Sequence, residues 1–129
     1  MAKSVNDDVL DAALDEIINN ADTRVACEGE PSTYADATTD KGNGGNALGE
    51  TTITAGDFSK SDGDTSGRKL TVPQQTGVSV DVDGTVDHEA IVDDTQSRLL
   101  HVTTTTSQSV TTGGTMTLDS RDEEIEDPS

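Results

Sequence analysis

The chain has 129 residues, enough for one small domain, and 29% of them are hydrophobic, well below the roughly 45–50% apolar content of an average globular domain. Asp and Glu number 26 against 8 Lys and Arg, so the formal net charge is −18. Nucleic-acid binding needs clustered basic side chains, and single strands also need aromatic platforms, whereas this chain has no Trp, one Tyr and one Phe. We therefore expect no nucleic-acid partner.

The first twenty residues carry several aspartates where a secretion signal would have a positive and then an apolar segment. The sequence also has no run of 18 apolar residues, the length that a membrane helix requires. We expect a protein that is made in the cytoplasm and has no membrane partner.

Residues 5–20 have the spacing of an amphipathic helix. Ser4 is placed to cap the helix, and Asp7 and Asp8 in the first turn favour the helix dipole. Such a short helix is marginal alone, so its apolar stripe is predicted to pack against the rest of the domain or another subunit. The stripe consists of Val9, Leu10, Ala13, Leu14, Ile17 and Ile18.

Two features follow the helix. Cys27 is the single cysteine, which excludes an intrachain disulfide, and we interpret it as a packing residue. Residues 36–47 are rich in Gly and Asn and predict a polar loop without apolar anchors, mobile unless a neighbour holds it.

From about residue 50 to 120 the apolar period changes to two, and turn signals recur every eight to twelve residues. The 20 threonines suit the solvent faces of strands. We predict a mainly β fold, a small β-sandwich or β-barrel with one N-terminal amphipathic helix, and a mobile acidic tail at 121–129. The expected strands are 23–28, 50–54, 67–73, 77–83, 85–92, 97–105, 107–112 and 115–120.

The acidic residues are scattered from Asp7 to Asp127 and interleave with the β alternation. Interaction tails instead concentrate like charges in blocks, and a nucleic-acid mimic needs carboxylates at phosphate spacing, which the sequence does not reveal. In about 1 M salt the Debye length falls to roughly 3 Å, which would screen this charge. We favour a folded protein from a high-salt cytoplasm, in particular a haloarchaeal one.

His88 and His101 flank the turn signal at residues 93–96. A two- or four-residue loop closing there would set the two histidines opposite each other on paired strands, close enough to share a metal, with Asp87 or Glu89 as a third ligand. A three-residue loop would separate them. We prefer a structural histidine pair over a metal site.

Two aspartate-rich segments resemble cation sites only faintly. The segment from Ser79 to Gly84 has Ser at the first calcium-loop position and Ala90 at the twelfth, where a bidentate Glu belongs. Asp57, Asp62 and Asp64, around Gly63 and Gly67, are expected by chance in a chain with 18 aspartates. We predict no metal, no cofactor and no catalytic residues, because nucleophile and phosphate-loop motifs are lacking.

Several stretches resemble a family of small structural proteins encoded among the head and neck genes of tailed viruses that infect bacteria and haloarchaea. The similar stretches are Leu10–Leu14, Thr23–Cys27, Glu30–Ala37, Gly56–Phe58, Asp64–Lys69, His88–Val102 and Ile125–Pro128. They cover most of the chain and are fold signatures rather than chemical ones. The resemblance implies a non-enzymatic, mostly β particle component, although the high charge differs from the family.

We therefore expect a virion protein, most simply one that decorates or reinforces the capsid. Its expected partners are other virion proteins, the major capsid protein first, and further copies of itself. The low-charge run from Thr103 to Thr112 looks like an edge that invites partners, and icosahedral axes would favour a trimer or pentamer. The alternatives are a neck or tail component of the same virion, or a host-encoded halophilic module that binds a small ligand or cation.

Overall fold

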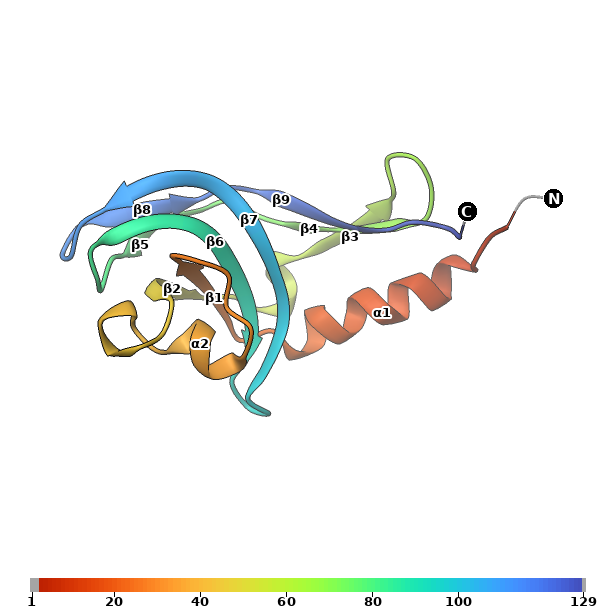
Figure 1. Cartoon of the computed structure of the whole chain (residues 1–129). Helices are drawn as coiled ribbons and strands as arrows, with labels where there is room; N and C mark the ends of the chain where they lie inside the picture. The colour runs from red at the N-terminus through yellow and green to blue at the C-terminus, as the bar shows by residue number, and fades with distance from the viewer. Residues whose placement is uncertain (1–2, 129) are drawn as a thin grey trace.

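Nine strands and two α-helices form residues 3–128, the part of the chain that the computed structural model describes (Figure 1). The arrangement confirms the predicted mainly β, sandwich-like or barrel-like fold with an N-terminal helix. A second, five-residue helix is an addition to the prediction. The elements are α1 (Asp7–Asn20), β1 (Thr23–Cys27), α2 (Tyr34–Thr38), β2 (Ala47–Thr52), β3 (Ser59–Asp62), β4 (Arg68–Val72), β5 (Gln75–Ser79), β6 (Gly84–Asp93), β7 (Arg98–Val110), β8 (Thr115–Leu118) and β9 (Arg121–Ile125).

The main sheet has the strand order β2-β1-β6-β7, and its long strands β6 and β7 are strongly curved (Figure 1). Its central strand β1 is buried on both faces from Arg24 to Cys27, and β6 is buried on both faces from Glu89 to Asp93. Val25 and Ala90 pack on one face beneath α2, whereas Ala26 packs on the other, with β5 and β8.

In the other layer, β4 and β5 pair with β9 and β8 to form one long ribbon with a bend, and β3 pairs with the other side of β4. Val72 of β4 pairs with Arg121 of β9, and three residues further on Gln75 of β5 pairs with Leu118 of β8. The register is therefore the same on both sides of the bend. Pro73 lies at the bend, where its missing backbone N–H interrupts the ladder.

Helix α1 packs mainly against β4 and buries Leu10 and Leu14. The prediction for this helix was wrong in two details. Asn6, not Ser4, is the N-cap, since its side-chain oxygen accepts a hydrogen bond from the backbone N–H of Asp8 at 2.8 Å. Ala13 and Val9 are exposed, so the buried stripe is narrower than expected.

Residues 36–47 have an apolar anchor, contrary to the predicted anchor-free polar loop. The segment contains the end of α2, and Ala37 is fully buried with Ala47 and Val25 in one cluster. A single small side chain in a polar segment is a weak signal in the sequence, which explains the wrong prediction. The backbone N–H of Ala47 also donates to the carbonyl of Thr39, and this bond ties the segment to β2.

The acidic segment after Ser120 is not a free tail. Residues Arg121–Ile125 form β9, which pairs along its whole length with β4. Ile125 packs at the margin of the cluster that contains Leu70 and Leu14. Burial alternates along this strand, but four of its five residues are charged, so its sequence shows no apolar alternation to recognise. The two strands expected at 97–105 and 107–112 are likewise a single strand, β7.

Candidate functional site

A buried charge cluster of Arg24, Glu89 and Arg121 lies between the main sheet and the bend of the ribbon. Arg24 from β1 is fully buried and Glu89 from β6 is 1% exposed. The Arg24 guanidinium donates from Nε and Nη2 to the Glu89 carboxylate at 2.9–3.2 Å. Arg121 from β9 donates to the same carboxylate from its Nε. One buried carboxylate thus holds two guanidinium groups from opposite layers.

Arg24 also binds both strands of the ribbon at its bend. Nη1 donates to the carbonyl of Pro73 at 2.7 Å and Nη2 to the carbonyl of Asp119 at 2.6 Å. Pro73 lies in the short gap between β4 and β5, and Asp119 lies in the gap between β8 and β9. The Arg24 guanidinium therefore satisfies backbone acceptors that the ribbon itself leaves unpaired.

His101 lies at the edge of this cluster. Its Nδ1 is 3.3 Å from Arg121 Nη1, and its Nε2 is 2.6 Å from a Glu123 oxygen. Burial and the Arg121 charge lower the pKa of His101 to about 4, while Glu89 acts in the opposite direction. The Glu123 carboxylate also forms an ion pair with Arg121, so its charge is shared with the guanidinium. We therefore take the imidazole as neutral at pH 7.

We expect His101 to make the protein less stable as the pH falls. Because its pKa is lower in the folded state than the ordinary 6.5, the unfolded chain binds the proton first, and stability is lost between pH 6.5 and about 4. Thermal unfolding at pH 7 and pH 4 should show that wild type loses on the order of 2 kcal/mol more than His101→Gln. An equal loss in both proteins would contradict a neutral, buried imidazole.

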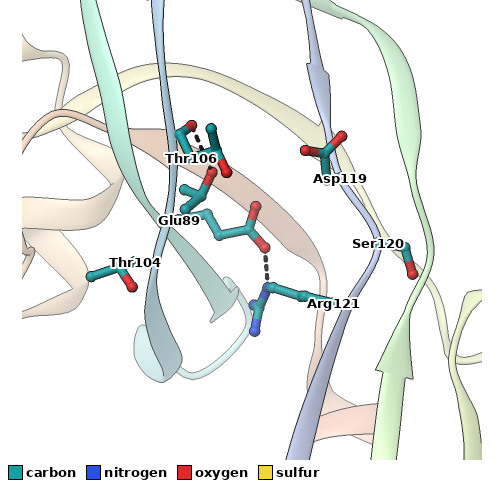
Figure 2. A pocket seen from close by; sticks show the side chains of 7 residues that line it. Glu89, Thr104, Thr106, Asp119, Ser120 and Arg121 are labelled. Atoms are coloured by element: carbon teal, nitrogen blue, oxygen red, sulfur yellow. Dashed lines mark hydrogen bonds and ion pairs between the residues drawn. The ribbon is translucent and has the colours of Figure 1, made fainter.

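A pocket of about 260 Å³ opens beside the cluster, between β7 and the corner that joins β8 to β9 (Figure 2). Figure 2 shows the Glu89 and Asp119 side chains facing this space from opposite strands. Its lining is polar and carries hydroxyl groups from both walls, in addition to the two carboxylates. The lining residues are Glu89, Thr104, Thr105, Thr106, Asp119, Ser120 and Arg121.

The predicted opposition of His88 and His101 is wrong. The hairpin loop has four residues, but the pairing begins at Asp93 with Arg98, and a bulge between Ile91 and Val92 shifts it further. His88 therefore pairs with Thr104 and lies on the opposite face of the sheet from His101. Its Nδ1 instead lies 2.8 Å from the carboxylate of the neighbouring Asp87.

The aspartates considered as cation ligands have separate structural roles. Asp57 accepts a hydrogen bond from the Thr54 backbone N–H in a capping box. Asp62 and Asp64 form ion pairs with Arg68 and Lys69, each at 2.7 Å. In residues 3–128, no group of three or more His, Cys, Asp or Glu side chains has the arrangement of a metal site.

The segment from Ser79 to Gly84, considered above as a calcium loop, forms the end of β5 and the turn that leads to β6. Val80 is buried there, whereas Ser79 and Asp81 are exposed, as the alternation predicts. Asp83 accepts a hydrogen bond from the backbone N–H of Thr112 at 2.6 Å and so joins this turn to the end of β7. The carboxylate therefore has a structural partner.

Cys27 is fully buried in the cluster beneath α2, which confirms its interpretation as a packing residue. Burial, with smaller effects from Asp87 and Glu89, raises the pKa of its thiol to about 12. We expect the native protein to resist a thiol reagent at pH 8 and to react once unfolded, because only the thiolate is nucleophilic. Rapid reaction of the native protein would contradict this burial.

The buried charge cluster was not predicted from the sequence. Arg24 directly precedes the apolar run Val25–Cys27 and Glu89 directly precedes the apolar run Ala90–Val92, and this contrast was the available signal. Their pairing was not visible, because it depends on how β1 and β6 align. Arg121 carried no such signal, since acidic residues follow it directly.

No family model matches the chain, and the searches of curated proteins and of solved structures give no match either. The resemblance to virus head and neck proteins therefore stays an expectation. None of the helices between residues 3 and 128 is long and apolar enough to cross a membrane.

Proposed function

We propose that this chain is a non-enzymatic structural protein of a tailed virus particle adapted to high salt, and that it decorates or reinforces the capsid. The observation that carries the proposal is the edge strand β7. It spans 13 residues and stands at the end of its sheet, with β6 as its hydrogen-bonded neighbour. No Asp or Glu occurs between Thr95 and Leu118, although the chain has 26.

A strand edge without carboxylates on a strongly acidic protein is suited to specific association. Elsewhere, like charges on two approaching molecules repel each other, whereas an edge strand offers backbone donors and acceptors to a neighbour. Natural monomers shorten or charge such edges. The edge strand β3 follows that rule, with four residues that include Lys60 and Asp62, and β7 does not.

The basic residues add support, because they are used inside the molecule. Every Lys and Arg from residue 24 onward forms a salt bridge with a carboxylate. Arg98, the single Lys or Arg between Thr95 and Leu118, is held by Asp93 and Glu16. Contacts through β7 would therefore rest on backbone and hydroxyl groups.

Quantitative mass spectrometry of purified particles tests the proposal. A capsid decoration protein should be present in numbers comparable to those of the major capsid protein. A few copies per particle would instead support the alternative of a neck or tail component. Absence from purified particles would overturn the virion role.

We expect the isolated protein to be folded in about 1 M KCl or NaCl and to lose tertiary structure at low salt. The acidic residues outnumber the basic ones by 18, and unscreened repulsion among them opposes compaction. A circular dichroism titration from molar to millimolar salt measures the transition. An unchanged strand signal at a few millimolar salt would refute the adaptation to high salt.

The pocket favours a second candidate, a host-encoded halophilic module that binds a small polar ligand or cation. Its hydroxyl groups and the Asp119 carboxylate provide oxygen acceptors on two walls. Thermal unfolding with Na⁺, Ca²⁺ or a polyol such as glycerol, at constant ionic strength, tests this role. A ligand-dependent stabilisation that Asp119→Asn abolishes would support it, and the same melting temperature with every compound would exclude binding of these probes.

A further inference from the structure

We propose that β7 is the surface through which two copies of this chain pair, strand against strand and antiparallel, so that their main sheets join into one. The inference rests on the proposed assembly role and names the first partner of the β7 edge. It also changes the expected trimer or pentamer to a two-fold dimer, since a strand that pairs with its own copy closes after two subunits.

Among the described residues, β6 is the one strand that pairs with β7, so the other side of β7 carries no backbone ladder. A pocket of about 260 Å³ is lined by Thr104, Thr105 and Thr106 of β7 and by Glu89 of β6, and Figure 2 shows the β8–β9 corner across that space. Thr104 and Thr106 are exposed. This stretch of β7 is therefore accessible from outside the molecule.

The pairing with β6 indicates where the contact would be centred. Two irregularities interrupt the β6–β7 ladder, one at Ile91/Val92 and one at Val86/His88. Between them, β7 is regular from His101 to Thr104. Because bulges twist an edge and disturb further pairing, the regular stretch is the part of β7 best able to accept another strand.

Charge selects a second copy as the occupant. Each copy carries −18, so most approaches between two copies are repulsive, and like charges opposite each other destabilise paired strands. An antiparallel β7 pair brings together Leu, Val, Thr, Ser and Gln side chains, with Arg98 and His101, and β7 contains no carboxylate. A different protein with an acidic contact strand would bring carboxylates to the interface. A protein with a basic contact strand would find no carboxylate on β7 to pair with.

Analytical ultracentrifugation in about 1 M KCl tests the pairing with a matched set of proteins. The double variant Thr104→Asp/Thr106→Asp places like charges on the edge. The control Asn43→Asp/Thr65→Asp adds the same charge at exposed residues outside β7. We expect a dimer for wild type and the control, and dimerisation at least tenfold weaker for the β7 variant. A monomeric wild type, or a dimer that the β7 variant leaves unchanged, would overturn the inference.

Hydrogen exchange on wild type alone provides a measurement that is independent of whether the variant folds. Amides of β7 should gain protection as the protein concentration rises, and those of the β3 edge should not. Protection that does not change with concentration in β7 would overturn the pairing. If wild type is monomeric and yet abundant in purified particles, the self-pairing fails and the proposed function stands.

Discussion

Replacing Glu89 with Gln is expected to lower the free energy of unfolding by about 3–5 kcal/mol. The substitution keeps the shape of the side chain and removes the one carboxylate that Arg24 and Arg121 share. Arg24 is fully buried, so its positive charge would have no nearby counterion and little access to water. Urea unfolding in about 1 M KCl, followed by circular dichroism, measures the loss.

Glu126→Gln is the matched control, because it changes the net charge equally at an exposed residue. It is expected to shift stability by less than about 0.5 kcal/mol. A loss of the same small size in Glu89→Gln would mean that the buried charge cluster contributes little to folding. Total stabilities of small domains are about 5–15 kcal/mol, so the expected loss is large enough to unfold much of the variant.

Leu14→Ala is expected to destabilise the protein by about 2–4 kcal/mol. Leu14 is 1% exposed and packs with Phe58, Leu70 and Ile91, so truncation leaves a cavity between α1 and the strands. The loss combines the lost burial of the side chain with the cavity that remains. Urea unfolding under the same conditions as for Glu89→Gln measures it.

Val9→Ala on the same helix separates packing from helix propensity. Val9 is 61% exposed, and its replacement should change stability by less than about 0.5 kcal/mol. Equal effects at Leu14 and Val9 would show that α1 is not docked as described. Since Lys60, Arg68 and Arg98 also form ion pairs with acids of α1, the comparison is best made in molar salt, which screens such exposed pairs.

Patterns within one strand were readable from the sequence, and pairings between strands were not. Val78, Val80, Val82 and Val86 alternate with polar neighbours, and Val78, Val80 and Val86 are buried while Val82 is partly buried. Met116 and Leu118 alternate with polar residues in the same way, and both are buried. Period-two alternation reports one strand's own two faces, so it needs no knowledge of the partner strand.

Contacts between distant segments were not predictable, because they depend on strand register, and because an acidic composition concealed β9. The bulge at Ile91/Val92 changed the partner of His101, and nothing local in the sequence marks that bulge. In β9 the acidic residues outweighed Arg121 and Ile125, so a paired strand looked like a solvated tail. The buried cluster and the pocket both require β9 and its corner in place, and for this reason the candidate site was not predicted.

The segments around Val5 and Asp127 lie next to each other, at the side of the molecule away from the β5 and β8 end (Figure 1). The backbone N–H of Val5 donates to the Asp127 carboxylate at 3.2 Å, so the first and last described segments are in direct contact. A reporter or display peptide joined to either of these segments would extend from the same side of the molecule. A short linker could also join these two segments in a circularly permuted protein. The new termini could then lie in an exposed turn such as Gly113–Gly114.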